Sequence, residues 1–276
     1  MNTVTHTTPE LYTAALCCLQ SNDPAEKVRL TGFYARQYRD GLLSIDNNQA
    51  VLPLPVPGRP AKPELVTPAK LVRRSIHTEQ GLQALVHAIC HIEFNAINLA
   101  LDAIYRFRDM PEDYYRDWWQ VAEEEAYHFS LLREHLNELG SDYGEFPAHN
   151  GLWEMACKTD HDVMVRMALV PRVLEARGLD VTPGMIKKLQ AAGDLRSVEI
   201  LEIILRDEVG HVAIGSHWFH RLCQQRELDS EPTFISLVKE YMTGSLKGPF
   251  YEEGRLQAGF TQNEIFSLKQ QAGQHE

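Results

Sequence analysis

The stretch 204–211 reads Ile204-Leu205-Arg206-Asp207-Glu208-Val209-Gly210-His211, and it decides the fold. Apolar residues recur around it at intervals of three and four, which is the period of an amphipathic helix, so we predict a long helix over residues 195–223. Glu208 and His211 fall on the apolar side of this helix. Burying a carboxylate and an imidazole is costly unless a partner compensates them, and a metal ion is one such partner.

The same pattern occurs earlier in the chain. An apolar stripe runs through residues 113–139, and Glu125 and His128 interrupt it at the same Glu-x-x-His spacing. The motif alone is weak evidence, because Glu and His are frequent in this sequence. The stronger evidence is that both copies of the motif fall on the apolar side of a predicted helix.

Each motif has a glutamate upstream in another helical segment. Glu93 lies in an apolar periodic run over 82–104, 32 residues before Glu125, and Glu175 lies 33 residues before Glu208. The chain therefore consists of two similar halves, each with one glutamate on a first helix and Glu-x-x-His on a second. This is the ligand arrangement of di-iron and di-manganese carboxylate bundles.

The length of the first half fits a helical hairpin. The turn near Asp109-Met110-Pro111 divides it into two arms of about 16 and 14 residues, roughly 20–24 Å each, which returns Glu125 to the height of Glu93. In the second half, Pro171 lies inside the third helix. Gly178 is expected to break that helix, and Thr182-Pro183 to begin a short helix over 183–192.

Charge balance favours a metal centre. The four glutamates carry four negative charges, which two divalent ions cancel, while two neutral imidazoles complete the ligand shells. Oxygen and nitrogen ligands of this kind suit iron or manganese better than a metal that prefers thiolates.

Composition limits the class of protein. The 276 residues, 44% of them hydrophobic, suffice for one large core. No uninterrupted apolar run approaches the length of a membrane span, and Met1–Pro9 is polar, so we expect no membrane partner and a cytoplasmic location. The five cysteines form no Cys-x-x-Cys pair and are expected to be reduced thiols.

The formal net charge of −11 disfavours a nucleic-acid partner without excluding one, because a local basic patch such as Lys187-Lys188 could overcome it. The state of oligomerisation is left open by the sequence.

Three segments are expected along the chain, together forming one compact unit. Residues 1–76 comprise N-terminal helices within 9–42, with Asp23-Pro24 as a helix start, and a strap over 52–68 that contains six prolines and must be extended. Residues 77–228 form the four-helix bundle, with a crossover loop at 140–151. Residues 229–276 form a C-terminal extension with helices over about 231–243 and 261–272 and an irregular stretch over 244–260.

The sequence resembles the bacterial ferritin-like family catalogued as domain of unknown function 455, and the resemblance covers nearly the whole chain from about residue 10. The matching stretches are Pro57-Gly58-Arg59-Pro60, His91-Ile92-Glu93, Glu124-Glu125-Ala126-Tyr127-His128-Phe129, 170–180, Arg206-Asp207-Glu208-Val209-Gly210-His211 and Lys247-Gly248-Pro249-Phe250 with Ala258-Gly259-Phe260. The resemblance implies an all-α, ferritin-like four-helix bundle with a carboxylate-bridged dinuclear centre. It does not imply a particular reaction.

Ligand roles follow from this resemblance. One metal is expected on Glu93, Glu125 and His128, and the other on Glu175, Glu208 and His211. Similar bundles imply that the glutamate of each Glu-x-x-His motif bridges the two ions. Metal-bound histidines usually donate their other ring proton to a carboxylate, so we predict that Asp207 serves His128 and that Glu124 serves His211.

Three further residues have open roles. His91 turns away from the ligand side of its helix and is expected to pack or hydrogen-bond near the site. Arg172 is expected in a structural salt bridge, with binding of an anionic substrate as the alternative. Tyr127 is the best candidate for an electron relay among aromatic residues that are otherwise core material.

The leading functional hypothesis is a di-iron oxidoreductase that activates dioxygen, a hydroxylase or monooxygenase of a small-molecule substrate with a separate electron-donor reductase. Manganese or a mixed iron and manganese pair is an alternative. Peroxide handling like that of manganese catalase, metal storage, hydroxylation of a tRNA nucleoside and a purely structural bundle are the competing functions.

Overall fold

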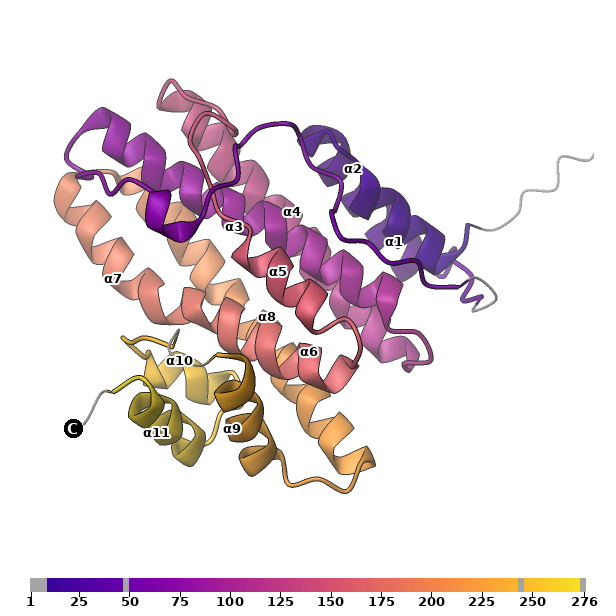
Figure 1. Cartoon of the computed structure of the whole chain (residues 1–276). Coiled ribbons are helices and arrows are strands. Elements are labelled where there is room, and N and C mark those ends of the chain that lie inside the picture. The colour runs from indigo at the N-terminus through magenta and orange to yellow at the C-terminus, as the bar shows by residue number, and fades with distance from the viewer. Residues whose placement is uncertain (1–8, 47–49, 243–245, 274–276) are drawn as a thin grey trace, which may run out of the picture. The chain divides into compact units, whose positions relative to one another are not determined.

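The computed structural model of the chain describes residues 9–46, 50–242 and 246–273 and is mostly helical (Figure 1). Among these residues there is no strand, and the only sheet-like pairs are the isolated bridges of Glu10 with Ser44 and Leu65 with Ala148. The prediction of an all-α chain is confirmed. The expectations that fall on residues 1–8 and 243–245, at the N-terminal polar segment and the end of the helix expected at 231–243, lie outside the described residues.

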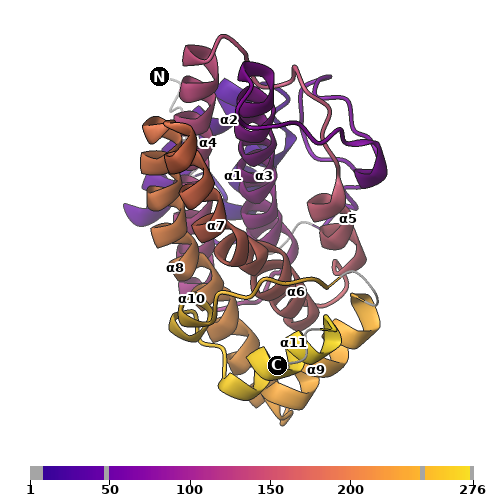
Figure 2. The same cartoon turned by 90° about the vertical axis from the view of Figure 1, so that its left-hand side faces the viewer.

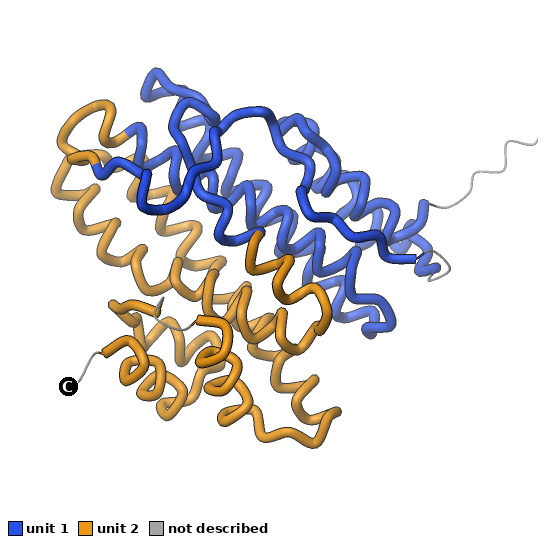
Figure 3. The backbone as a smooth tube through the Cα atoms, in the orientation of Figure 1, with its two compact units in different colours: residues 1–73, 83–153 blue, residues 74–82, 154–276 orange. Residues whose placement is uncertain are grey.

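The chain divides into two compact units (Figure 3). The first unit contains residues 1–73 and 83–153, and the second contains residues 74–82 and 154–276. Each unit contains one of the two Glu-x-x-His motifs.

A helical hairpin forms the centre of the first unit. It consists of α3 (Glu79–Arg106) and α4 (Glu112–Glu138), which lie side by side in both views (Figures 1 and 2). Their ends meet where the hydroxyl of Tyr114 donates to the carbonyl of Ala103 at 3.3 Å, and further along the rings of Phe94 and Phe129 are 5.5 Å apart. The hairpin returns the chain as the similar lengths of its two arms predict.

Two N-terminal helices, α1 (Leu11–Gln20) and α2 (Pro24–Arg39), pack on each other, and α2 packs on α4. The start of α2 is the predicted one, because the Asp23 side chain accepts a hydrogen bond from the Glu26 amide and Pro24 is the first helical residue.

The proline strap, residues 52–68, contains no helix until the short η1 (Pro68–Lys70), as its six prolines predict. Hydrogen bonds and one close backbone approach hold the strap in place. The amide of Gly58 donates to the carbonyl of Leu19, and a Cβ at Gly58 would lie 2.2 Å from the carbonyl carbon of Gln20. The indole of Trp153 donates to the carbonyl of Pro55. Only glycine fits at position 58, which explains its place among the prolines.

In the second unit, α6 (Val163–Leu169) leads into a π-helical segment, η2 (Val170–Glu175), and then into α7 (Ala176–Ala192). The expected break at Gly178 and the short helix starting at Thr182-Pro183 are wrong, because α7 runs through both. Pro171 has no amide hydrogen for the bond one turn back, and the helix widens there to a π-helix instead of ending.

The long helix α8 (Leu195–Gln225) begins at Asp194, whose side chain accepts from the Ser197 amide. Both η2 and α7 pack along α8. The approach is closest at Gly215, where a Cβ would lie 2.4 Å from side-chain atoms of Pro171. Packing along α8 compensates for the helix-breaking residues of α7.

The C-terminal part of the second unit contains α9 (Ser230–Tyr241), α10 (Glu252–Gln257) and α11 (Gln262–Gln271). The stretch expected to be irregular before residue 260 therefore includes a short helix. Arg172 is fully buried and donates to Glu264 of α11 at 2.8 Å, which confirms the structural salt bridge. Its guanidinium is surrounded by the rings of Phe219, Phe234 and Phe260.

Two further sequence expectations bear on the environment of the chain. The cysteines are free thiols. Helix α3 contains no uninterrupted apolar run as long as a membrane span, yet it is long enough to span a membrane and has an 18-residue stretch with a mean hydropathy of 1.4, which is typical of a membrane-spanning helix. In the structure 78% of that stretch is buried, as in the core helix of a globular protein.

Candidate metal centre

The first ligand trio comes together inside the first unit. Glu93 on α3 and Glu125 and His128 on α4 each offer a ligand atom, and these atoms all lie within 4.8 Å of one another. Nδ1 of His128 is 3.3 Å from Oε2 of Glu93 and 3.5 Å from Oε2 of Glu125. All three side chains are at most 3% exposed. The pairing of α3 with α4 therefore assembles two carboxylates and one imidazole around a common point.

The electrostatics of this trio are strained without a cation. Burial and the neighbouring charge of Glu125 raise the pKa of Glu93 to about 8. Burial by itself lowers the pKa of His128, but its contacts with Glu125 and Glu93 outweigh that effect and raise the pKa to about 11. One imidazolium lies beside two carboxylates, and burial together with the charge of Glu125 favours the protonated form of Glu93.

The surroundings of the trio are dry. Val121, Ala122 and Phe129, the helical neighbours of Glu125, are at most 1% exposed, and Phe94 next to Glu93 is 2% exposed. A low dielectric strengthens both the repulsion between the carboxylates and their attraction to any ion placed between them.

The donor set fits a divalent metal ion. Ligand atoms on one first-row ion lie about 2.0–2.2 Å from it and hence no more than roughly 4.4 Å apart, close to the 4.8 Å that encloses these atoms. Nδ1 of His128 is the ring nitrogen that faces the carboxylates, so it is the one available to an ion.

The second predicted trio belongs to the second unit, but its three ligand atoms are not gathered within 4.8 Å of one another as those of the first trio are. Glu208 and His211 are one turn apart on α8, with Nδ1 of His211 at 3.9 Å from Oε1 of Glu208. Glu175 is the last residue of η2, which packs on α8. The three residues are at most 8% exposed. π-helical turns are frequent at functional sites, and this one ends at a predicted ligand.

The two acidic residues predicted to serve the histidines make hydrogen bonds with neighbours on their own helices. Asp207 accepts hydrogen bonds from its neighbour Arg206, and Glu124 accepts one from Gln120 at 3.0 Å. Their roles towards His128 and His211 stay predictions.

The remaining candidates take different positions. His91 contacts the hydroxyl of Tyr143 through Nδ1 at 2.9 Å and the carbonyl of His149 through Nε2 at 3.1 Å, so it ties α3 to the crossover loop. Tyr127 is 51% exposed and belongs to the surface of α4, whereas the other aromatic residues proposed as core, including Trp118 and Trp119, are buried.

Sequence reasoning missed a second polar feature of α3. Five polar residues recur on one side of this apolar helix at intervals of four, four, three and four, and each is at most 6% exposed. The spacing is visible in the sequence, but this run contains no Glu-x-x-His pair that would mark it as a ligand set. The residues are His87, His91, Asn95, Asn98 and Asp102.

Comparison with known proteins gives a consistent result. The family described as Protein of unknown function (DUF455) matches residues 20–266. A protein of Haemophilus influenzae described as an uncharacterized protein is 48% identical over 257 residues, which cover 90% of this chain and 89% of that relative. No solved structure matches.

Proposed function

Since the chain belongs to the family of Protein of unknown function (DUF455), we propose a function for it from its buried ligands. It binds a pair of divalent ions, iron or manganese, and oxidises a small-molecule substrate with dioxygen. The proposal includes the ferritin-like four-helix bundle and the dinuclear centre implied by the sequence. The observation that carries it is the buried cluster of Glu93, Glu125 and His128.

The cluster supports metal binding because burying these three groups together costs free energy that a bound cation would offset. Two buried carboxylates beside one imidazole destabilise a fold, and apolar residues of similar size would pack there without this cost. The same combination of carboxylates and imidazole recurs on η2 and α8, in a second unit with its own core. A function that needs both trios is the simplest reason for both.

The residues of the chain have distinct tasks in this proposal. The glutamates hold the ions and neutralise their charge, and each histidine offers a neutral nitrogen. Because Nδ1 of His128 carries a proton in the metal-free chain, binding of an ion releases that proton. Bound iron supplies the exchange of electrons with dioxygen. The apolar side chains around Glu125 keep water away from the ligands.

The test is a metal and turnover analysis of matched variants. Wild-type protein should contain about two equivalents of iron or manganese per chain and consume dioxygen when a chemical reductant is present. Glu125→Gln should lose metal and turnover together. Glu134→Gln, an exposed glutamate on the same helix, is the control and should retain both.

The outcomes separate the competing functions. A Glu125→Gln variant that keeps both metals and full oxygen consumption contradicts the proposal. Rapid decomposition of hydrogen peroxide without oxygen consumption in the presence of reductant points to peroxide handling instead. A wild-type protein that binds neither iron nor manganese removes the proposal altogether.

A further inference from the structure

Tyr143 of the crossover loop lies against apolar side chains that flank the first ligand trio. Its ring centroid is 5.3 Å from that of Phe94 and 5.2 Å from that of Phe129, which meets it edge-on. Phe94 follows the predicted ligand Glu93 in α3, and Phe129 follows the predicted ligand His128 in α4. Tyr143 therefore contacts the immediate neighbours of two of the three ligands in this trio.

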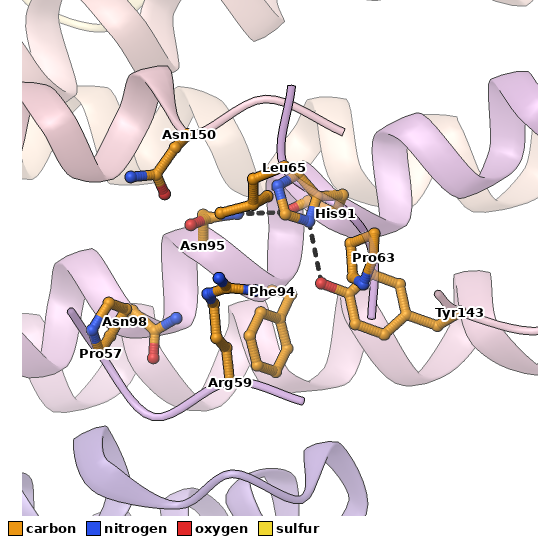
Figure 4. Close-up of a pocket in the computed structure, with 10 residues that line it drawn as sticks. All are labelled: Pro57, Arg59, Pro63, Leu65, His91, Phe94, Asn95, Asn98, Tyr143 and Asn150. Carbon is orange, nitrogen blue, oxygen red and sulfur yellow. Dashed lines mark hydrogen bonds between the residues drawn. The ribbon is translucent and has the colours of Figure 1, made fainter. Parts of the chain in front are cut away.

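The hydroxyl of Tyr143 has a base within hydrogen-bonding distance, Nδ1 of His91 on α3 at 2.9 Å (Figure 4). Nε2 of the same imidazole is 3.1 Å from the carbonyl of His149. A carbonyl only accepts, so Nε2 carries the ring proton and Nδ1 presents a lone pair to the phenol. The side-chain amide of Asn95 is also 3.0 Å from Nε2, but it has the carbonyl of His91 as its acceptor at 2.8 Å. Tyr143 is therefore the donor and His91 the acceptor of their hydrogen bond.

The phenol of Tyr143 keeps its proton at neutral pH. Burial raises its pKa well above the ordinary value. The rings of His87, Phe94 and Phe129 pack around it and limit its contact with water. A neutral phenol becomes strongly acidic when it loses an electron, so it is oxidised readily only where a positioned base takes the proton. Nδ1 of His91 is such a base.

Tyr127, the aromatic residue that the sequence favoured as an electron relay, lacks this combination. Its ring centroid is 6.4 Å from that of the ligand His128, so it is near the trio. The residue is 51% exposed, however, so solvent and not a fixed base receives its proton, and external reductants reach it directly. A lasting oxidised state is therefore expected at Tyr143 and not at Tyr127.

We propose that Tyr143 is a one-electron relay of the metal centre. The inference rests on the proposed function, because the oxidant is the iron held by the first trio after dioxygen has oxidised it. The phenol gives one electron to that iron, its O–H bond breaks, and the proton passes to Nδ1 of His91, which leaves a neutral tyrosyl radical and an imidazolium. Tyr143 is itself partly exposed, so a reductant at the surface of the crossover loop returns the electron and the proton moves back.

The test is a single oxidation of the iron-loaded, full-length protein. Ferrous iron is bound under argon, dioxygen is added without reductant, and the frozen sample is measured by electron paramagnetic resonance. Iron content and dioxygen consumption are determined on the same sample. Wild type should give an organic radical whose signal narrows when the protein contains ring-deuterated tyrosine. The radical should form more slowly in deuterium oxide, because a proton moves with the electron.

Three variants locate the radical. Tyr143→Phe keeps the ring but lacks the hydroxyl, so it should bind the same amount of iron and lose the signal. His91→Gln offers a hydrogen-bond acceptor that is too weak a base to take the proton, so it should lose most of the signal. Tyr127→Phe makes the same chemical change at an exposed position of α4 and should retain both iron and signal.

A measurement on wild type alone covers the case in which a variant fails to fold. The radical should couple magnetically to a histidine nitrogen, which isotopically labelled histidine reveals. Iron that is bound and oxidised without a tyrosyl signal, or a signal that persists in Tyr143→Phe, contradicts the relay and leaves the proposed function standing. A signal that is lost in Tyr127→Phe and retained in Tyr143→Phe does the same. A wild-type protein that binds no iron contradicts both.

Discussion

Replacing Glu93 by glutamine should have opposite effects on the metal-free and the metal-loaded protein. The pKa of Glu93 is raised to about 8 from an ordinary value of 4.5, so at pH 7 the folded chain must hold a proton that the unfolded chain has released. At about 1.4 kcal/mol per pH unit, the 2.5 units between 4.5 and 7 amount to about 3 kcal/mol. A glutamine side chain is uncharged at every pH, so the folded Glu93→Gln chain does not bear this cost of protonation.

The metal-free Glu93→Gln protein should therefore be more stable than wild type by about 1–3 kcal/mol at pH 7, the lower figures reflecting hydrogen bonds that the new amide fails to make. The raised pKa of Glu93 also decides how the stability difference between variant and wild type changes with pH. A carboxyl whose pKa is raised on folding destabilises the protein increasingly as pH rises from about 4.5 to 8, so the advantage of the variant should shrink towards pH 5.

Metal should reverse this order. A ligand at a thousand times its Kd stabilises the folded state by about 4 kcal/mol, and the variant should lose most of this gain. The assay is urea unfolding of chelator-treated protein at pH 5 and pH 7, with and without added manganese or ferrous iron under argon. Glu134→Gln is the matched control and should stay within about 0.5 kcal/mol of wild type. A metal-free Glu93→Gln protein that is less stable than wild type, or one that retains the full metal-dependent gain, refutes the reasoning.

Three other substitutions have definite expected effects. Glu264→Gln keeps the shape of the side chain but leaves the buried guanidinium of Arg172 without its counter-ion, so it should cost about 3–5 kcal/mol by urea unfolding. A loss below 1 kcal/mol would argue against this ion pair. Burial lowers the pKa of Lys27 to about 7, so above pH 7 the folded chain loses a proton that the unfolded chain keeps. Wild type should then gain up to about 1.4 kcal/mol per pH unit between pH 7 and 10 relative to Lys27→Met, and parallel stability profiles would contradict this. Gly58→Ala should cost at least about 1–3 kcal/mol because its Cβ meets the backbone of Gln20, and a neutral thermal unfolding midpoint would be inconsistent with that contact.

The helices of this chain were largely predictable from the sequence because their apolar periodicity is strong and their starts carry capping residues. Asp23 and Asp194 cap the helices that were expected to begin there. The hairpin of α3 and α4 was predicted from the lengths of its two arms alone. The same lengths predicted that Glu93 and Glu125 lie at the same height and meet.

The features that were missed depend on tertiary packing. Gly178 and Pro183 are local helix breakers, and only the long contact of α7 with α8 shows that the helix continues through them. The π-helix at Pro171 is likewise a response to a proline held inside a packed helix. The partner of Arg172 could not be found from spacing, because Glu264 is 92 residues away in the chain.

The polar side of α3 was missed for another reason. Its spacing was visible in the sequence, but the sequence does not show that the strap and crossover loop bury Asn98 without satisfying its amide.

The most direct measurement of the proposed function is anomalous diffraction from crystals of the purified protein at the iron and manganese absorption edges. The proposal predicts two peaks, one bound by Glu93, Glu125 and His128 and the other by Glu175, Glu208 and His211. Crystals soaked in ferrous or manganous salt that show no peak at either trio, or peaks only at other side chains, would contradict it.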